Sequence, residues 1–336
     1  MDVKLVLERI KFVLKNNLIL FFLMFLFFVQ GLKAQPVPAI DENIPFIVTF
    51  GKDADPIWGD DDFCQIFFFI IPESRIDPIF LRVYDPDTNG KNDEPKHDFN
   101  TKINFSIYGG NSCWSNKDAQ AVNPENNYKS GVLIASKTFG ADSQYDEKWY
   151  TFGPINPFEG ELVEKFGGRV FKVIAEGISG DDGNLYNYFL SSTPNENKEI
   201  EGGNFFTYEY TFRLANNISH VSQIYPYIDD ETTSIKIWNF DWDNDGKIKV
   251  ISVAKNGLSC NVSGEGEWVI KDFPIIDEEK NTSLEVQFIK KQSSLVKNNN
   301  VSIIIQNQYG ISLPFYVIPI GGVPVYNPKI RMVEID

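Results

Sequence analysis

Two loops of the chain carry oxygen-bearing side chains at alternate positions, each set followed by a glycine. Asp85, Asp87 and Asn89 precede Gly90, and Asp241, Asp243 and Asp245 precede Gly246. Carboxylate and amide oxygens at this spacing, with a glycine that permits a sharp turn, can wrap a hard cation such as Ca²⁺. The spacing therefore predicts two candidate calcium loops.

Neither loop is an EF-hand, because that motif needs a bidentate Glu at its twelfth position. Lys96 and Ser252 occupy those positions here. Asp93 offers another way to complete the first loop, whereas no nearby residue completes the second. Asp181 and Asp182 add two carboxylates in a third acidic turn. These carboxylates are distant in sequence, so only the fold can bring them to the first loop.

A fourth acidic turn, residues 59–62, precedes a long apolar run. Carboxylates that the fold brings together repel one another unless a cation lies between them. The alternative is that these residues only form turns, since Asp, Asn and Gly are the usual residues there. We predict a structural Ca²⁺ that stiffens loops and performs no chemistry. Its predicted ligands are Asp85, Asp87, Asn89, Asp93, Asp181 and Asp182, with Asp241, Asp243 and Asp245 in the second loop.

The sequence predicts no enzyme. Its two histidines, His97 and His220, are far apart and lack partners for a catalytic triad. The sequence contains no nucleophile elbow, zinc-protease motif or phosphate-binding loop. Glu161 and Glu164 are three residues apart, which fits a solvated surface better than a glycosidase pair. A hydrolase with an unrecognised site remains the second alternative function.

Tryptophans in polar stretches provide a different kind of candidate site. Trp114 and Trp242 lie in or near such stretches, and exposed indoles can stack on sugar rings or anchor a protein contact. Trp242 is expected to be exposed because Asp241 and Asp243 flank it. These two residues are the predicted ligand-binding residues, and a secreted carbohydrate-binding protein is the first alternative function.

The elements that position these residues are predicted to be strands. Aromatic residues are plentiful, with 28 Phe, which favours sheet. The run 64–71 is apolar on both faces and is expected at the centre of a packed sheet. Residues 157–166 alone suggest a short helix. A jelly-roll-like sandwich is predicted for residues 44–215, with strands at 44–50, 64–71, 79–84, 102–108, 131–138, 148–152, 169–176, 185–191 and 205–214.

A second sandwich is predicted after a junction at residues 216–227. The range 228–320 suits an immunoglobulin-like sandwich by the spacing of its short strands, although the Cys–Trp–Cys pattern of antibody domains is missing. Strands are expected at 234–241, 247–254, 258–263, 267–270, 283–289, 300–306 and 312–318. Residues 321–336 form the predicted C-terminal tail or linker. The fold class is therefore all-β, with two tandem antiparallel β-sandwiches after a signal peptide.

The three cysteines leave two interpretations. Cys64 and Cys113 could form a disulfide in an oxidising compartment, with Cys260 alone. All three could equally be buried thiols, because free Cys packs as a small apolar residue. No pair has the spacing of a zinc site.

Residues 1–34 predict a secretory signal peptide. Basic residues precede the apolar run 18–29, and the small Ala34 ends the segment. The run has about twelve residues, short of the roughly 20 that a membrane-spanning helix needs. A retained N-terminal anchor is the alternative. We expect an exported mature chain that begins near Gln35, continues through a linker at 35–43 and has no integral membrane span.

The charge of the chain restricts its partners. The formal net charge is −15, and removal of residues 1–34 takes away five basic and two acidic side chains, which leaves about −18. Such a field repels nucleic acids and anionic lipid headgroups. Nucleic acid is therefore excluded as an expected partner.

Three segments carry a resemblance to a known group of proteins. These are residues 171–191, with their Gly180-Asp181-Asp182-Gly183 turn, residues 82–90 and residues 105–110. They resemble the N-terminal β-sandwich region of exported Gram-negative envelope proteins that often carry a C-terminal OmpA-type domain, which is not expected in these 336 residues. The resemblance implies a non-catalytic binding or structural module located in the periplasm, at the outer membrane or on the cell surface. Its implied partner is an envelope or surface protein, or a glycan.

Overall fold

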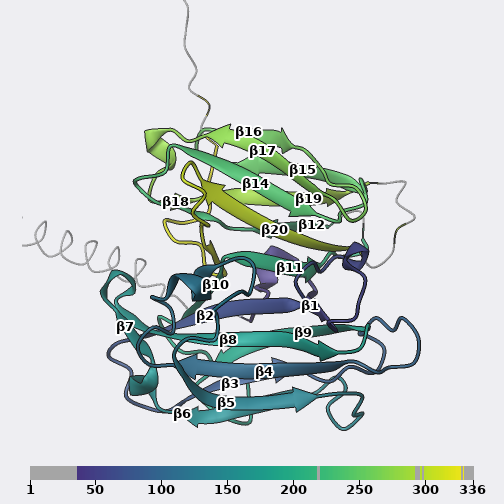
Figure 1. Ribbon diagram of the computed structural model, residues 1–336. Coiled ribbons are helices and arrows are strands. Elements are labelled where there is room, and N and C mark those ends of the chain that lie inside the picture. Colours follow the sequence, from purple (N-terminus) through teal and green to yellow (C-terminus); the bar gives the residue numbers. More distant parts are fainter. Residues whose placement is uncertain (1–35, 218–219, 292–295, 297–298, 327, 329–336) are drawn as a thin grey trace, which may run out of the picture. The chain divides into compact units, whose positions relative to one another are not determined.

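The computed structural model describes residues 36–217, 220–291, 296, 299–326 and 328. The predicted signal peptide lies outside the described residues, as does most of the C-terminal tail. Apart from short 3-10 turns, the regular elements of the described part are strands (Figure 1). The prediction of an all-β chain built from antiparallel sheets is confirmed. The strands are β1 (Phe46–Phe50), β2 (Cys64–Pro72), β3 (Ile79–Tyr84), β4 (Lys102–Gly109), β5 (Val132–Phe139), β6 (Trp149–Ile155), β7 (Glu161–Val163), β8 (Gly168–Ser179), β9 (Gly183–Ser191), β10 (Asn204–Thr207), β11 (Glu209–Arg213), β12 (Val221–Ile224), β13 (Tyr227–Ile228), β14 (Ser234–Phe240), β15 (Gly246–Ile251), β16 (Asn256–Cys260), β17 (Trp268–Pro274), β18 (Thr282–Ser283), β19 (Glu285–Lys290), β20 (Asn300–Asn307) and β21 (Phe315–Tyr316).

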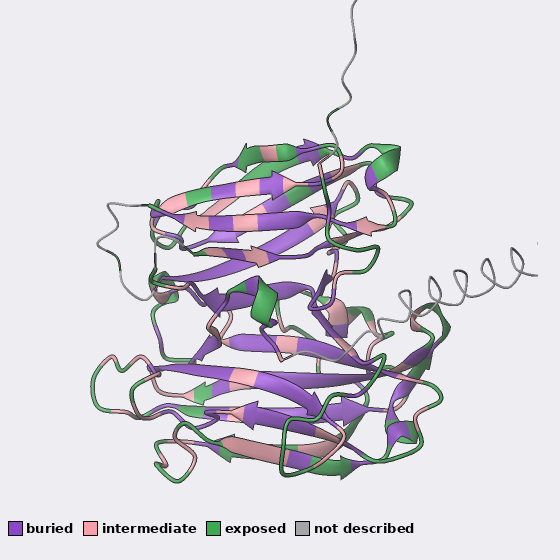
Figure 2. Ribbon diagram, turned by 180° about the vertical axis from the view of Figure 1, so that it is seen from behind, coloured by how far each residue is buried: buried purple, intermediate pink, exposed green. Residues whose placement is uncertain are grey.

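Two large sheets and two small ones contain these strands. The eight-stranded sheet has the order β17-β14-β20-β11-β1-β9-β3-β6, and the larger part of the seven-stranded sheet has the order β21-β10-β2-β8-β4-β5. A four-stranded sheet has the order β12-β19-β15-β16, and β13 pairs with β18. The strand interiors are mostly buried and the connecting loops mostly exposed (Figure 2).

The two predicted sandwich ranges share the eight-stranded sheet. β11 belongs to the first range, and its residues Glu209 to Arg213 pair with β20 of the second. Tyr210 and Phe212 point to the same face of β11, because residues two apart in a strand share a face. Tyr210 contacts Phe67 of β2, with ring centroids 5.4 Å apart, and Phe212 contacts Phe288 of β19 at 5.3 Å. The seven-stranded and four-stranded sheets therefore pack against one face of a common sheet, and the predicted junction contains β12.

The strand β2 has the central position that its apolar sequence predicted. It lies between β10 and β8. Phe67 and Phe69 face the main core, and Phe68 and Ile70 face a smaller cluster on the opposite side. Phe68 stacks on Phe206 of β10 with ring centroids 5.1 Å apart. Both faces of β2 are therefore covered, which explains why no polar alternation is visible in this run.

The prediction of a short helix at residues 157–166 is wrong. The segment forms the 3-10 turn η4 (Pro157–Glu159), the strand β7 and the 3-10 turn η5 (Glu164–Phe166). Glu161 and Val163 are buried and Leu162 is exposed, which is the period-two alternation of a strand. Pairing of β7 with β8 satisfies its backbone groups, so the tertiary partner decides the local structure.

Candidate metal centre

The loop 85–93 follows β3 and is bound to the turn that precedes β6. Asp85 has a φ of 56°, a left-handed conformation that Asp adopts more readily than most residues. Its backbone N–H donates to the Lys148 carbonyl at 2.9 Å. Its carboxylate accepts hydrogen bonds from the Glu147 backbone N–H and from Asn92 Nδ2, each at 2.7 Å. These bonds hold the loop against residues 145–148.

Asp87 is the most unusual residue of this loop. Its side chain is fully buried, and neither carboxylate oxygen has a hydrogen-bond partner. Burial raises the pKa of Asp87 to about 7, with further increases from the charges of Asp85 and Asp146. Interactions with the backbone N–H groups of Asp87 and Asp142 partly offset this increase. A buried carboxylate without a hydrogen-bond partner is costly, so the Asp87 side chain favours a bound positive charge.

Asp146 supplies a further carboxylate from the turn before β6. Its Oδ1 is also buried without a partner. A Cβ atom on Gly90 would lie 2.2 Å from this oxygen, so Asp146 approaches the glycine of the loop directly. Asp146 was not among the predicted ligands, because it lies in an ordinary polar turn almost 60 residues from Asp87 and no spacing connects the two.

Asn89 and Asp93 close the loop. Asp93 Oδ2 accepts a hydrogen bond from the Asn89 backbone N–H at 2.6 Å, and Asp93 Oδ1 accepts one from Leu185 N–H of β9 at 2.8 Å. Burial raises the pKa of Asp93, and the charges of Asp85 and Asp87 raise it further. Asp93 therefore fixes the loop to the sheet and adds negative charge on the side of Asp85 and Asp87.

The donor set of this loop suits a hard cation. The charge of Asp146 contributes to the raised pKa of Asp85, and the charges of Asp85 and Asp146 contribute to the raised pKa of Asp87. Oxygen ligands from carboxylates are what Ca²⁺ prefers, and a cation among them would offset the repulsion. The ligand type present therefore suits calcium, and Asp146 is an additional candidate ligand, although these three carboxylates are not among the described groups whose oxygens all lie within 4.8 Å of one another.

Asp181 and Asp182 contact the loop 96–101, and Asp181 also has a buried Oδ1 without a hydrogen-bond partner. The Asp182 carboxylate is buried and accepts backbone N–H bonds from Lys96, Asn100 and Thr101 at 2.8–3.1 Å. Asp181 Oδ2 lies 3.2 Å from Nδ1 of the exposed His97. Asp182 thus shapes the loop 96–101, with its oxygens already used by the backbone.

In the second acidic loop, residues 241–245, other groups of the protein offset the negative charge. Burial raises the pKa of Asp241 to about 7, and Asp241 Oδ1 accepts a hydrogen bond from the Gly266 backbone N–H. Asp243 remains half-buried beside it. Asp245 Oδ2 lies 3.6 Å from Lys290 Nζ, so an ammonium already provides positive charge in this loop. The case for a metal ion is therefore weaker here than at Asp87.

The expectation that Trp242 is exposed is wrong. Its side chain is completely buried in the main core, with its ring centroid 5.4 Å from that of Phe288. A Cβ atom on Gly246 would lie 2.5 Å from Trp242 Cζ2, so the indole packs directly over this glycine. The flanking Asp241 and Asp243 both have left-handed backbones, which turn the indole inward while the loop stays polar. Trp242 is not available for stacking on a sugar.

Trp114 is half-buried and packs within the smaller cluster beside β2. Its Nε1 donates to the Tyr208 hydroxyl at 3.1 Å. Phe166 meets its ring edge-on with centroids 5.1 Å apart, and Lys165 Nζ lies 4.3 Å from its centroid. Glu161 Oε2 accepts its backbone N–H at 2.6 Å. These contacts assign Trp114 a packing role and leave only part of the indole open.

Glu161 and Glu164 differ in their surroundings. Glu161 binds backbone N–H groups, whereas Glu164 is exposed in η5. The three cysteines are free and buried. Cys64 and Cys113 belong to one small apolar cluster, and burial raises the pKa of Cys113 to about 12, which keeps it a thiol.

The fold and this loop define an antiparallel β-sandwich protein with a buried acidic centre. The chain matches no protein-family model and no curated protein at significant similarity. Among the described residues, no helix is both long and apolar enough to cross a membrane.

Proposed function

We propose that the chain is an exported, non-catalytic binding or structural module of the cell envelope, stiffened by Ca²⁺ in the loop 85–93. The observation that carries the calcium proposal is the Asp87 carboxylate, which is fully buried with two unpartnered oxygens. The resemblance of residues 82–90, 105–110 and 171–191 to envelope sandwich regions supports the location.

The cation would be held by Asp85, Asp87 and Asp146, with Asn89 and Asp93 shaping the loop around them. It would join the loop after β3 to the turn before β6, two strands that pair at the end of the eight-stranded sheet. A loop fixed in this way loses little conformational entropy when a partner binds. The calcium centre would therefore serve recognition and not bond cleavage.

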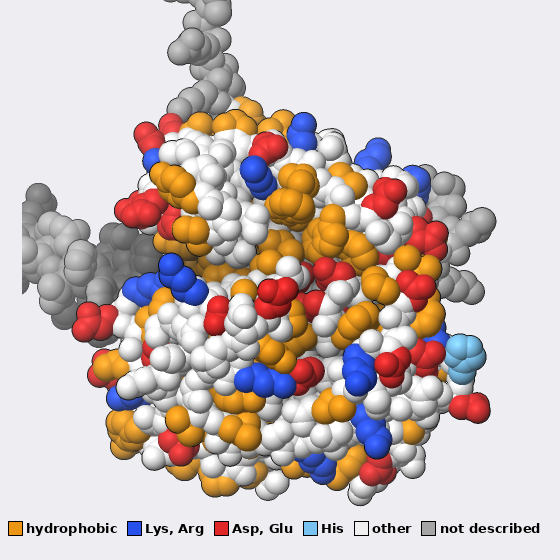
Figure 3. Space-filling model, viewed as in Figure 1, with side chains coloured by type: hydrophobic (Ala, Val, Ile, Leu, Met, Phe, Trp, Pro, Cys, Tyr) orange, Lys and Arg blue, Asp and Glu red, His pale blue; other side chains and the backbone are white. Residues whose placement is uncertain are grey.

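The partner we propose is an envelope or surface protein, or a glycan. The strongly negative charge disfavours nucleic acid. On the face drawn in Figure 3, acidic and basic side chains of the described residues are interspersed and form no continuous basic patch. The carbohydrate-binding alternative has less support, because Trp242 is in the core and Trp114 is largely engaged.

Thermal unfolding with and without Ca²⁺ tests the calcium proposal. Ca²⁺ should raise the melting temperature, because a ligand that binds only the folded state stabilises it, by about 2.7 kcal/mol at a concentration of 100 Kd. Asp87→Asn, which preserves side-chain size, should lose most of the increase in melting temperature that is due to Ca²⁺ binding in the loop 85–93. The exposed Asp98 provides the matched control, since Asp98→Asn should respond like the wild type. A wild-type protein that is indifferent to chelator contradicts the proposal.

Cell fractionation tests the proposed location. Mass spectrometry of the protein from the envelope or medium should find a mature N-terminus near Gln35. An intact Met1 on protein confined to the cytoplasmic fraction would contradict export.

A further inference from the structure

A second group of carboxylates lies at the turn before β2. One carboxylate oxygen from each of Asp60, Asp61 and Asp62 lies within 4.8 Å of the others. Hydrogen bonds fix this turn: Asp60 accepts backbone N–H groups from Phe50 at 2.7 Å and from Phe63 at 3.0 Å. These bonds explain the shape of the turn but bring no positive charge to it.

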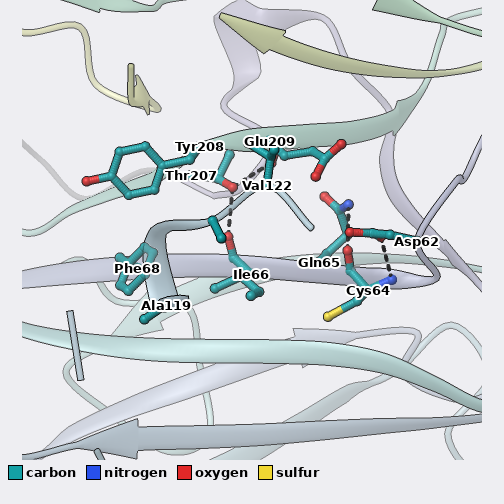
Figure 4. Close-up of a pocket in the computed structure, with 11 residues that line it drawn as sticks. Asp62, Cys64, Gln65, Ile66, Phe68, Ala119, Val122, Thr207, Tyr208 and Glu209 are labelled. Carbon is teal, nitrogen blue, oxygen red and sulfur yellow. Dashed lines mark hydrogen bonds between the residues drawn. The ribbon is translucent and has the colours of Figure 1, made fainter. Parts of the chain in front are cut away.

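Glu209, the first residue of β11, adds a fourth carboxylate from a distant part of the sequence. Its side chain is 7% exposed, and its Oε1 has no hydrogen-bond partner. Figure 4 shows it extending from β11 toward the side of the cavity where Gln65 and Asp62 lie. Burial raises the pKa of Glu209 well above its usual value, and the charges of Asp62, Asp61 and Asp60 raise it further. The buried, unpartnered Glu209 therefore faces the acidic turn.

The part of the chain that the structure describes provides no counter-ion for this group. Among the described residues, the ion pairs of Lys, Arg and His involve none of the four carboxylates. Asp61 Oδ1 is also buried without a partner. Three aspartates lie in one turn and Glu209 lies across a small cavity from Asp62, and Asp61 and Glu209 each have a buried oxygen without a hydrogen-bond partner. This arrangement favours a bound positive charge.

A small cavity lies beside both Asp62 of the acidic turn and Glu209, whereas Asp60 and Asp61 do not line it. A cavity of about 10 Å³ is lined by Asp62, Gln65 and Glu209 among other residues (Figure 4). This volume corresponds roughly to one water-sized sphere. Ca²⁺ holds oxygens at about 2.3–2.6 Å, so ligands on opposite sides of the ion are about 5 Å apart, whereas the shorter bonds of Mg²⁺ bring them to about 4 Å. The three aspartate oxygens lie within 4.8 Å of one another, so one ion can reach all three, and a site with several carboxylates favours Ca²⁺ over Mg²⁺.

This acidic group lies where the first predicted sandwich range meets the second. Asn300 Nδ2 of β20 donates to the Trp58 carbonyl at 2.7 Å, just before the turn. A Cβ atom on Gly59 would lie 2.5 Å from Asn300 Cβ, so the backbone approaches β20 closely. The Trp268 indole of β17 interacts with Asp61. Residues of both ranges therefore surround the carboxylates.

We infer that Asp60, Asp61, Asp62 and Glu209 form a binding site for one Ca²⁺ ion, which fastens the turn before β2 to β11 at the contact between the two sandwich ranges. Asp61 and Asp62 supply oxygens that are not used by the backbone, whereas Asp60 mainly adds charge, because both of its oxygens accept backbone N–H bonds. Glu209 supplies charge from the strand that both ranges share. This site is separate from the proposed centre at Asp87, and it stabilises the contact between the ranges instead of a peripheral loop.

Calorimetric titration of the full chain with CaCl₂ tests this inference, because it counts sites. The Asp87→Asn variant should still bind one Ca²⁺, and adding Glu209→Gln should abolish that binding. Adding Glu201→Gln instead is the matched control, since Glu201 is exposed and binding should persist. If the Glu209→Gln protein fails to fold, Asp61→Asn in the same background replaces it. Loss of all binding in Asp87→Asn alone overturns the inference and leaves the proposed function standing.

Terbium provides a second readout, because Tb³⁺ occupies calcium sites and emits when a nearby indole transfers energy to it. In the Asp87→Asn background, Tb³⁺ emission should fall strongly on Trp268→Phe, since this indole interacts with Asp61. Emission should also fall on Glu209→Gln and should be displaced by Ca²⁺. Emission that is unchanged in both variants overturns the inference.

Discussion

Gly90 and Asp146 approach each other so closely that a methyl group on Gly90 would lie 2.2 Å from Asp146 Oδ1. The glycine belongs to the loop after β3 and the aspartate to the turn before β6. Their contact turns a local run of acidic residues into a centre built from two segments. The absence of a Cβ on Gly90 therefore leaves the room that the Asp146 carboxylate needs to approach this loop.

Gly90→Ala should weaken Ca²⁺ binding by displacing Asp146. The substitution also places a Cβ at a φ of 89°, a backbone strain of about 1–2 kcal/mol. Gly310→Ala is the matched control, because Gly310 has a φ of 74° but open space where its Cβ would lie. Both variants should melt at lower temperature, and Gly90→Ala alone should lose Ca²⁺ affinity in calorimetry. Equal affinity in the two variants would contradict the role of Asp146.

The stability of protein stripped of divalent cations should fall as the pH rises from about 4 to 7. The pKa of Asp87 is raised from 3.8 to about 7 in the folded state. In this window the unfolded chain has lost a proton that the folded chain still holds, so raising the pH favours unfolding. Each pKa unit corresponds to about 1.4 kcal/mol, so the loss amounts to a few kcal/mol at most. Below this window both states are protonated, and above it both are ionised.

Urea unfolding at pH 5 and pH 7 measures this dependence. Asp241, whose pKa is also raised to about 7, contributes in the same direction. The difference in pH slope between wild type and Asp87→Asn therefore isolates Asp87, and identical slopes would show that its pKa is not raised. Ca²⁺ should remove the part of the pH dependence of stability that Asp87 contributes, because Ca²⁺ binds the ionised carboxylate. Protons compete with the ion, so the Ca²⁺ affinity falls as the pH is lowered.

The strands were predictable, whereas their pairing across the chain was not. The run 64–71 indicated a central strand because both of its faces are apolar, and β2 is central. The pairing of β11 with β20 joins segments almost 90 residues apart, and no local pattern sets such a register. Sequence reasoning therefore predicted two sandwich ranges but not the sheet that they share.

The residues of the candidate sites were likewise predictable where a local spacing revealed them and not where tertiary structure brings them together. Alternating oxygens before Gly90 indicated a cation loop, because that spacing is local. Asp146 and Glu209 could not be found, since each reaches its carboxylate partners only through tertiary structure. Trp242 was misplaced because acidic neighbours suggested exposure, whereas left-handed residues on both sides turn its side chain into the core.

Trp242→Ala should therefore destabilise the fold instead of abolishing binding of a ligand. Removing a fully buried aromatic side chain leaves a cavity and typically costs about 3–5 kcal/mol. Trp242→Phe should cost less, because it retains contact with Phe288, and Tyr309→Ala is the control since Tyr309 is 72% exposed. Urea unfolding gives the free energies. If Trp242→Ala were as stable as Tyr309→Ala, the indole could not occupy the core, and its earlier assignment as an exposed platform for a sugar or a protein would regain support.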